Sequence, residues 1–466
     1  MRRFLTRRDF IAQTTLATAG LMTSTHAYAQ GGRERPNIIL AMTDDQGWGD
    51  VGYNGNQLIQ TPVLDEMAAN GIRFDRFYAA APVCSPTRGS CMTGRHPNRY
   101  GCFSWGYDLP LEEVTLAEAL KTVGYATGHF GKWHLGGVPT SPDKRDRTNR
   151  GNLQWAKPPH PGNQGFDEWF SYWNFFDLNP QHFHHNGQPV GPLEGDGSDI
   201  TVDRALQWIR TVVARQQPFL AVVWFGNPHG PHQALDKDKA LYPDEPEKQQ
   251  NYLGELSGVD RAMGTLRKGL RELGVADNTM LWFCSDNGGT AAGNNGGLRG
   301  HKGSLWEGGV RVPGILEWPA RVRRPVRTSV PACTSDFYPT IADLLDIRLP
   351  NQTRPLDGIS LLPLIDGKMD ERPQPIAFEI RSNRETVGWA VLSDNRYKLH
   401  VVEEARAGGR RDGRPSGIAL YDLVADPAER SDLAAEKTDV AAAMKAKLEA
   451  WQASVERSLA GEDYRR

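Results

Sequence analysis

Short apolar runs alternate with helical patterns through most of the chain. Three runs, 37–42, 219–225 and 279–284, are dominated by apolar residues and bounded by polar ones. Runs of this length are typical of strands that are buried on both faces. Apolar residues recur at helical spacing in 252–273, and 62–69 starts at a proline and stops shortly before a glycine, as many helices do. The alternation predicts an α/β fold with a large, mainly parallel or mixed sheet flanked by helices.

The pattern changes near residue 350. Beyond it the chain carries three short runs that predict strands, followed by a helical pattern; the runs are 389–392, 397–402 and 419–423, and the helix is 440–459. The charged segment 403–417 is predicted to be a hairpin loop. We therefore predict a main domain over 30–350 and a C-terminal subdomain over 351–466, built as a small antiparallel sheet with a helix.

The segment 139–197 shows neither the helical nor the strand period of apolar residues. It is rich in proline, glycine and polar residues, yet it holds eight large aromatic side chains: Trp155, Phe166, Trp169, Phe170, Tyr172, Trp173, Phe175 and Phe176. A linker would not need them. We expect a set of long loops that cover one edge of the main sheet.

Composition excludes two classes of function. The 54 Lys and Arg residues balance 56 Asp and Glu residues, for a formal net charge of −2, so there is no basic excess of the kind that nucleic-acid binding requires. No apolar run approaches the length needed to cross a bilayer. The 39% apolar content is that of a globular protein.

The first 29 residues have the features of an export signal. Arg7-Arg8 lies before a mildly apolar run, and Ala27-Tyr28-Ala29 offers a small-x-small cleavage site. This order predicts a twin-arginine signal peptide over 1–29, the twin-arginine translocase as a partner, and a periplasmic or extracellular destination. The alternative is an amphipathic N-terminal helix.

Polar clusters follow all three predicted strands directly. Asp44-Asp45 follows the first, Asn227-Pro228-His229 the second, and Asp286-Asn287 the third. Because ligands bind at the carboxyl edge of such sheets, we expect these clusters to meet there. Asp44, Asp45, Asp286 and Asn287 are hard oxygen ligands that suit Ca²⁺ or Mg²⁺ rather than zinc. The alternative is that both pairs only cap helices or shape turns.

Cys84 opens a segment, Cys84-Ser85-Pro86-Thr87-Arg88, that predicts a helix with a proline in its first turn. The free N–H groups of a helix N-terminus stabilise anions, and Arg88 in the same turn can hold oxygen atoms bidentately. A lone cysteine is otherwise most often buried and inert. The pairing of the remaining cysteines is left open by their spacing, which fits no zinc site; they are Cys91, Cys102, Cys284 and Cys333.

Lys132 and His134 alternate by two in Gly131-Lys132-Trp133-His134-Leu135-Gly136. On an extended segment both side chains would therefore face one side, with Trp133 on the other. An exposed strand end with a stacked tryptophan would show the same pattern.

These motifs together resemble the type I sulfatases of the alkaline phosphatase-like superfamily. The resemblance rests on the segment from Cys84 to Arg95, on Gly131 to Gly136, on Asn227 to His232 and on Leu298 to Pro313, and more loosely on Leu420 to Glu429. The resemblance is highly specific over roughly residues 36–350 and looser over the C-terminal part. In that family the cysteine is oxidised to formylglycine by a formylglycine-generating enzyme, and a divalent cation is held by residues that match Asp44, Asp45, Asp286 and Asn287, beside the modified Cys84.

The resemblance also implies roles for the cations and histidines. It assigns Lys132 to the sulfate, and His229 and Lys302 to the departing alcohol. One hydroxyl of the hydrated aldehyde would attack sulfur, and His134 would then take the proton of the second hydroxyl so that sulfate leaves. We expect sulfate monoester hydrolysis, with a sulfated carbohydrate as substrate and aryl sulfates as model compounds.

Histidines are the candidates for substrate recognition. His182, His184 and His185 lie in the aromatic segment, and His232 follows His229 closely. A wall of the substrate pocket is one interpretation; plain loop structure and a second metal site are the others.

Two other functions fit the same residues. A phosphonate or phosphodiester hydrolase would use the same fold and metal. A non-catalytic binder of sulfated glycans would keep Cys84 as a thiol.

Overall fold

A computed structural model describes residues 35–136, 159–174, 178–348, 354–402, 414–415 and 417–464. Residues Pro36–Arg466 form one compact unit, to which the description below refers. The predicted signal peptide over 1–29 lies outside the described residues. Within them, no helix is both long and apolar enough to cross a membrane.

The three buried strands predicted from sequence are confirmed as the centre of a ten-stranded mixed sheet. β1 (Asn37–Thr43) is paired in parallel with β8 (Phe219–Trp224) on one side and β9 (Thr279–Ser285) on the other. β4 (Ala126–Lys132) and then β5 (Glu168–Tyr172) extend the parallel part beyond β8. The outer strands complete the order β12-β2-β11-β9-β1-β8-β4-β5-β6-β7 and are β2 (Ile72–Phe74), β11 (Gly314–Glu317), β12 (Val326–Thr328), β6 (His184–His185) and β7 (Gln188–Pro189).

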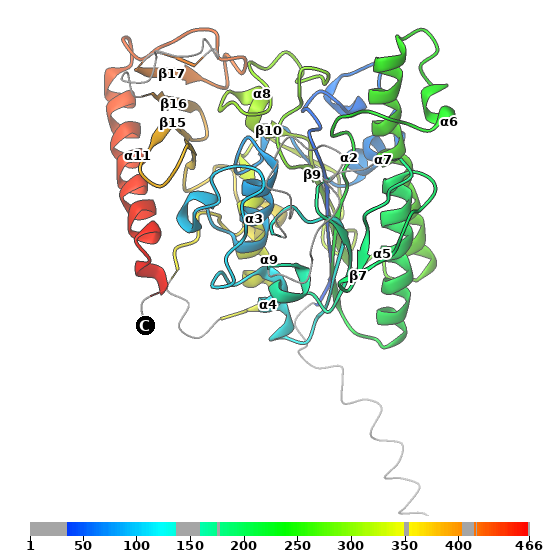
Figure 1. The fold of residues 1–466 in the computed structure, drawn as a ribbon. Helices are drawn as coiled ribbons and strands as arrows, with labels where there is room; N and C mark the ends of the chain where they lie inside the picture. Colours follow the sequence, from blue (N-terminus) through cyan, green and yellow to red (C-terminus); the bar gives the residue numbers. More distant parts are fainter. Residues whose placement is uncertain are drawn as a thin grey trace, which may run out of the picture. The chain divides into compact units, whose positions relative to one another are not determined.

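Both faces of this sheet are covered by helices, which explains why its central strands β1, β8 and β9 are almost continuously apolar. Along β1, Ile38, Leu40 and Met42 pack into one apolar core and Ile39 and Ala41 into another. Helices α2 (Pro62–Asn70), α5 (Gly197–Ala214) and α7 (Glu247–Glu272) contribute to the second core. Helices α3 (Cys84–Thr93), α4 (Leu116–Lys121) and α9 (Phe337–Leu345) contribute to the first, on the opposite face (Figure 1).

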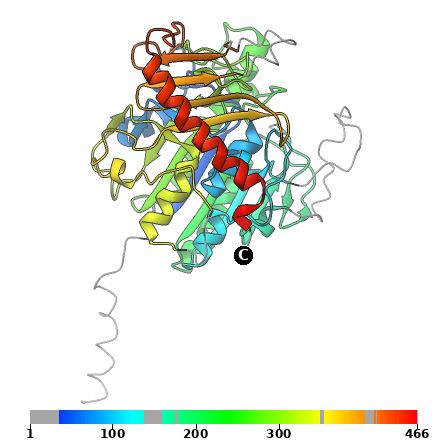
Figure 2. The ribbon, with the colours of Figure 1, turned by 90° about the vertical axis from the view of Figure 1, so that its left-hand side faces the viewer.

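The predicted C-terminal sheet is confirmed, with one strand more than expected. β14 (Ile376–Arg381), β15 (Val387–Ser393), β16 (Tyr397–Val401) and β17 (Ile418–Asp422) form an antiparallel meander. The long helix α11 (Thr438–Leu459) crosses one face of it (Figure 2). The other face packs on Tyr78, Trp306 and Val310 of the main part.

Short elements connect these layers. A three-stranded sheet consists of β3 (Phe77–Tyr78), β10 (Arg311–Val312) and β13 (Ala332–Cys333), and three single-turn helices are α6 (Asp236–Lys239), α8 (Glu307–Val310) and α10 (Leu362–Ile365). The predicted domain boundary after residue 350 falls at 349–353, outside the described residues, and stays a prediction. So does the hairpin loop over 403–417, of which only 414–415 and 417 are described.

The prediction of loops throughout 139–197 is wrong in part. Trp169, Phe170 and Tyr172 are buried in β5, hydrogen-bonded in parallel to β4. Aromatic residues favour strands, but the five residues of β5 are too few to show a period against the surrounding prolines and glycines. Trp155, Phe175 and Phe176 lie outside the described residues.

Candidate functional site

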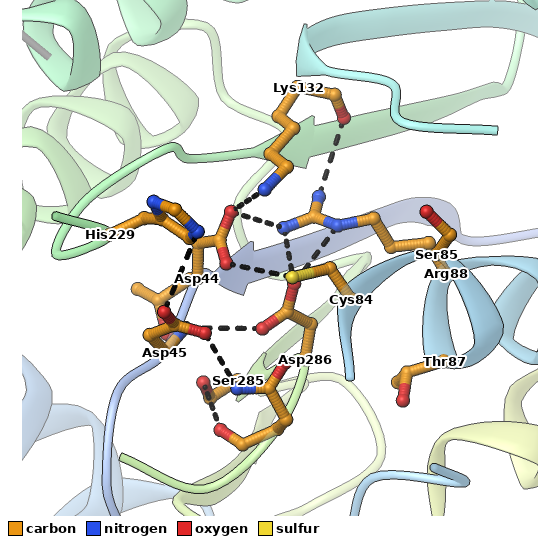
Figure 3. Close-up of polar contacts among 12 residues, drawn as sticks. Asp44, Asp45, Cys84, Ser85, Thr87, Arg88, Lys132, His229, Ser285 and Asp286 are labelled. Atoms are coloured by element: carbon orange, nitrogen blue, oxygen red, sulfur yellow. Dashed lines mark hydrogen bonds and ion pairs between the residues drawn. The ribbon is translucent and has the colours of Figure 1, made fainter. Parts of the chain in front are cut away.

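Four parallel strands end at the same level, and this brings the predicted polar clusters together. Met42 is in register with Trp224 of β8 and Cys284 of β9, and Gly131 of β4 with Trp224. The residues that follow in each strand therefore emerge at one edge of the sheet. This edge collects Asp44, Asp45, Lys132, His229 and Asp286 (Figure 3).

Lys132 reaches this edge because a glycine precedes it. Gly131 has a φ of 96°, and a Cβ there would lie 1.9 Å from the carbonyl oxygen of Trp224. Only glycine lets β4 pass so close to β8 in this conformation. The expectation that Lys132 and His134 alternate along an extended segment is wrong, because β4 ends at Lys132 and His134 has a φ of 55°.

Cys84 is the first residue of α3, as predicted, and its thiol is 1% exposed. The hydroxyl of Thr87 ties down the preceding loop, since it accepts from the N–H of Ala81 and donates to its carbonyl oxygen. The sulfur lies 3.4 Å from Oδ1 of Asp44 and 3.6 Å from Nζ of Lys302. Burial, followed by the charges of Asp286 and Asp44, raises the pKa of Cys84, so its thiol is a weak nucleophile.

The question of cysteine pairing is resolved. All five cysteines are free and buried, including Cys91, Cys102, Cys284 and Cys333. None of them forms a disulfide with Cys84 or with another.

Arg88, one turn into α3, holds the site together. Its Nε and Nη2 donate to Oδ2 of Asp286 at 3.0 and 2.7 Å, and Nη2 lies 3.4 Å from Asp44. The guanidinium carbon lies 5.1 Å from the ring centroid of Trp224, a cation–π contact. Two carboxylates from different strands are thus bound to one side chain (Figure 3).

The carboxylates differ in their electrostatic surroundings. Burial would raise the pKa of Asp44, but Lys132, which donates to it, and His229 and Arg88 hold that pKa well below its usual value. Burial and the charge of Asp44 raise the pKa of Asp286 to about 7, despite Arg88. Two neighbouring carboxyls whose pKa values shift in opposite directions repel each other when both are ionised, and a cation bound between them would stabilise both charges.

Asp45 forms the outer part of the site. Nζ of Lys302 lies 2.6 Å from its Oδ1, and Nε2 of His229 lies 3.7 Å from its Oδ2. His229 and Lys302 are the more open groups, with side chains 21% and 22% exposed. Nδ2 of Asn287 donates to Oδ1 of Asp45 at 2.7 Å.

These residues fit a divalent cation. Ligand atoms of Asp44, Asp45, Cys84 and His229 all lie within 4.8 Å of one another. Asp286 and Asn287, which sequence placed in the metal site, join the same group through the backbone N–H and the carboxylate of Asp45. Among the described residues, Oδ1 of Asn287 is buried without a hydrogen-bond partner. A buried acceptor left unpaired beside three carboxylates is typical of a hard-cation site.

His134 follows Lys132 by two residues and is 1% exposed. Neither ring nitrogen has a hydrogen-bond partner within the described residues. The ring meets Trp173 edge to face, at 5.2 Å between centroids. Burial and the charge of Lys132 hold its pKa well below the usual value, so the imidazole is neutral and can accept a proton.

The four predicted substrate histidines do not form one group. His185, in β6, pairs with Glu168 at 2.5 Å and has 53% of its side chain exposed. His232 pairs instead with Glu255 of α7 at 2.8 Å. His184 is buried in β6, and its Nδ1 contacts the carbonyl oxygen of His182 at 3.1 Å. Their role in substrate binding stays a prediction.

Two supporting residues escaped the sequence analysis. Trp224 stacks on Arg88, and nothing distinguishes it from its neighbours in a uniformly apolar strand. Ser285 accepts from the N–H of Gln46 and donates to the carbonyl oxygen of Asn287, both at 3.0 Å. Its place as the last residue of β9, before Asp286, was the available signal.

Comparison with known proteins identifies the family. The family model described as sulfatase matches residues 36–347. The chain belongs to the sulfatase family. Human arylsulfatase A is 32% identical over 446 residues, covering 85% of this chain and 83% of that protein. The mouse N-acetylgalactosamine-6-sulfatase is 31% identical and covers 80% of this chain and 73% of that protein.

Solved structures agree with this sulfatase assignment. The crystal structure of Ps i-CgsB in complex with k-i-k-neocarrahexaose has a TM-score of 0.78 at 27% identity, covering 92% of this chain and 97% of that one. The mixed sheet, the small C-terminal sheet and the helix α11 are thus those of the alkaline phosphatase-like sulfatases. The protein is a sulfuric ester hydrolase of a metal-dependent family.

Proposed function

We propose that this sulfatase hydrolyses the sulfate monoester of a carbohydrate through a formylglycine hydrate formed from Cys84. The observation that carries the proposal is the position of Cys84. Its sulfur lies at the N-terminus of α3, 3.4 Å from Asp44 and 3.6 Å from Lys302. A thiol whose pKa is raised by burial performs poorly there, whereas a hydrated aldehyde at the same atom presents two hydroxyls.

The charges of the site suit a sulfate ester. Arg88, Lys132 and Lys302 balance the carboxylates of Asp44, Asp45 and Asp286, so a divalent cation would leave the pocket with a net positive charge. Negative charge grows on the sulfate oxygens and on the leaving oxygen as the ester bond breaks. Fixed cations in a water-poor site stabilise that charge most strongly.

The metal and the side chains have separate tasks in this proposal. Asp44, Asp45, Asp286 and Asn287 would hold Ca²⁺ or Mg²⁺, which supplies a Lewis acid that lowers the pKa of a bound hydroxyl. Lys132 and Arg88 orient the sulfate. Since His229 and Lys302 are the exposed groups, they donate a proton to the departing alcohol. His134, which is neutral and has no hydrogen-bond partner within the described part of the chain, accepts the proton that must leave residue 84 before sulfate is released.

The decisive experiment is the mass of the tryptic peptide 77–88, in which Cys84 is the only cysteine. We expect the mass of an aldehyde in place of the thiol when the chain is made with a formylglycine-generating enzyme. Peptide 89–95, which contains Cys91, is the control from the same digest and should keep its thiol. An unmodified Cys84 in active protein would contradict the mechanism. An unmodified Cys84 in protein without sulfatase activity would instead favour the non-catalytic, glycan-binding alternative.

Turnover of para-nitrophenyl sulfate tests the reaction itself. Cys84→Ala should lower kcat by at least about 10³-fold, because it removes the nucleophile. Comparison with bis(para-nitrophenyl) phosphate separates the sulfatase from the phosphodiesterase alternative. A higher kcat/KM for the phosphodiester would favour the alternative.

The carbohydrate substrate rests on the relatives. One similar protein is named for N-acetylgalactosamine 6-sulfate, and a similar structure holds a carrageenan hexaose. Assay of both compound classes tests whether this chain shares either preference.

We also propose that residues 1–29 direct export by the twin-arginine translocase. The support is Arg7-Arg8 before an apolar run. Replacement of both by lysine should leave the precursor in the cytoplasm, as measured by cell fractionation.

A further inference from the structure

The segment from Phe103 to Leu109 is attached on both sides to residues next to the reactive centre. The N–H of Gly106 donates to Oγ of Ser85, the neighbour of Cys84, at 2.9 Å. The N–H of Leu109 donates to the carbonyl oxygen of Leu135, the neighbour of His134, also at 2.9 Å. A Cβ on Gly106 would lie 3.9 Å from Trp173, whose ring meets His134. The segment therefore connects Ser85, the neighbour of Cys84, with Leu135, the neighbour of His134.

This segment exposes large rings. Trp105 is 57% exposed and Tyr107 is 41% exposed, and they flank Gly106 on either side. Phe103 meets Tyr107 edge to face at 5.9 Å, which fixes the latter ring. Trp105 directly precedes Gly106, which is hydrogen-bonded to the neighbour of Cys84, and its exposed indole offers a large apolar face to a ligand. We call residues 103–107 the aromatic loop.

A cavity lies against the same loop. It has a volume of about 190 Å³ and is lined by Phe103 and Ser104 of the loop, by Val83 and Pro86, which lie within two residues of Cys84, by Gly303, which follows Lys302, and by Arg381 of β14. Sites for drug-sized ligands begin at roughly 300 Å³. The smaller volume fits one ring or part of one, and the lining includes the residue that precedes Cys84 and the residue that follows Lys302 in the sequence.

The lining of the cavity favours a neutral, hydroxylated group. Its two charged residues, Glu379 and Arg381, are paired with each other. Proline, valine and phenylalanine side chains offer C–H surface, and Ser104 offers a hydroxyl. A second sulfate would find no free cation among these lining residues and would meet the carboxylate of Glu379.

Resting on the proposed function, we propose that the aromatic loop and this cavity bind a neutral sugar ring on the leaving-group side of the ester, with Trp105 stacking on its C–H face. Pyranose rings present both an apolar face and a rim of hydroxyls. The exposed indole matches the apolar face, and the small cavity with its apolar surface and the Ser104 hydroxyl matches the ring edge. Trp105 is therefore a specificity-determining residue that contacts the sugar and not the sulfate.

The test is competition against para-nitrophenyl sulfate turnover by the formylglycine-bearing enzyme. The competitors are galactose 6-sulfate, N-acetylgalactosamine 6-sulfate and a carrageenan hexasaccharide, with inorganic sulfate as a probe that has no ring. In Trp105→Ala the inhibition constant of at least one sugar sulfate should rise about tenfold, the loss expected for one stacking contact. That of inorganic sulfate should change less than about twofold.

Two further variants complete the design. Trp105→Phe, which keeps a stacking ring, should restore most of the affinity for the sugar sulfate. Val424→Ala, at a residue 70% exposed in another part of the chain, should change no inhibition constant. If none of the sugar sulfates competes, or if Trp105→Ala weakens inorganic sulfate equally, the inference is overturned. Absence of nitrophenyl sulfate turnover in the wild-type enzyme would instead refute the proposed function.

Discussion

Two buried groups of charges in this protein are built for opposite purposes. The active-site cluster consists of Asp44, Asp45, Asp286, Arg88, Lys132 and Lys302. The interface cluster lies where the C-terminal sheet meets the main part and consists of Glu307, Lys398, His400 and Glu429. Apart from Lys302, whose side chain is 22% exposed, these side chains lie in the interior, where an uncompensated charge is strongly destabilising.

The interface cluster is complete. Nζ of Lys398 lies 3.0 Å from Glu307 and 3.2 Å from Glu429, and His400 shares Oε1 of Glu429 at 2.8 Å. Nδ1 of His400 accepts from Trp389, and the other oxygen of Glu429 accepts from the backbone N–H of Glu307. Burial lowers the pKa of His400, so it is neutral with its proton on Nε2.

The active-site cluster is incomplete in comparison. Oδ1 of Asn287 and both ring nitrogens of His134 are buried without partners among the described residues. Asp286 keeps a pKa raised to about 7, chiefly by burial and Asp44. The interface cluster therefore needs no further partner to stabilise the fold, whereas the active-site cluster has the unpaired groups that the proposed cation and substrate would complete.

Lys398→Met should have the largest effect on stability. It removes the cation that Glu307 and Glu429 share, although Tyr78 and Arg311 still contact Glu307, and breaking a buried ion pair typically costs about 3–5 kcal/mol. We expect a loss of that size in the free energy of unfolding, measured by urea denaturation. Lys445→Met, which removes an exposed partner of Glu449, should cost less than about 1 kcal/mol. Equal losses would show that the interface cluster is no more tightly coupled than a surface pair.

Metal binding should stabilise only the incomplete cluster. A cation at about 100 times its Kd adds about 2.7 kcal/mol to the free energy of unfolding. We expect Ca²⁺ or Mg²⁺ to raise the melting temperature of the metal-free protein, and Asp45→Asn to reduce that rise. Glu429→Gln should lower the melting temperature yet leave the rise intact. A metal response that survives Asp45→Asn would place the cation elsewhere.

Much of the fold follows from local pattern. The strands β1, β8 and β9 are continuous apolar runs, and α7 and α11 have apolar residues at helical spacing. β5 was not predicted, because its five residues carry no period of their own among prolines and glycines. α5 was missed although Asp196 caps it and its apolar face is regular.

The candidate site was predicted better than its surroundings. Asp44, Asp45 and Asp286 follow the ends of parallel strands closely, so chain order places them at one edge of the sheet. Cys84, Arg88 and Lys302 lie in α3 and in a loop, and only the resemblance to the sulfatase motifs pointed to them. The interface cluster was not predicted, since Glu307 and Glu429 are 122 residues apart and single charges within strands carry no local signal. The bend at His134 was missed for a related reason: a positive φ at a non-glycine residue depends on its tertiary contacts.

Asp50 belongs to neither cluster. It is a buried acid whose hydrogen-bond donors are all neutral. It accepts from Tyr252 at 2.5 Å and from the N–H groups of Gly47 and Asn294, and burial raises its pKa from 3.8 to about 7. The folded state therefore binds the proton more tightly than the unfolded chain. Asp50 thus contributes stability that is complete below pH 4 and is lost as pH rises to about 7, by at most about 1.4 kcal/mol per pH unit.

Asp50→Asn should flatten this part of the pH profile. The amide cannot ionise, so the free energy of unfolding should fall less steeply between pH 4 and 7 than in the wild type. Urea denaturation at four pH values over that range measures the slope. Asp439→Asn, at an exposed position in the first turn of α11, is the control and should keep the wild-type slope. A slope unchanged in Asp50→Asn would show that other groups cause the change in the free energy of unfolding between pH 4 and 7.

Trp224→Phe should have the smallest effect on stability. It tests whether Trp224 supports the active-site cluster through its contact with Arg88 or only packs in the core. The phenyl ring weakens the contact with Arg88, worth about 0.5–2 kcal/mol, but it also removes an indole N–H that is buried without a partner among the described residues. The two changes oppose each other, so we expect less than about 2 kcal/mol in the free energy of unfolding. Because Arg88 positions Asp286, kcat/KM should still fall by about two- to tenfold.

Trp282→Phe is the matched control. Trp282 lies in β9, packs on Phe74 and Phe337, and like Trp224 has a buried indole N–H without a partner among the described residues. This substitution should change stability by a similar amount and leave kcat/KM unaltered; an equal loss of activity in both variants would mean that packing alone, and not the contact with Arg88, accounts for the effect.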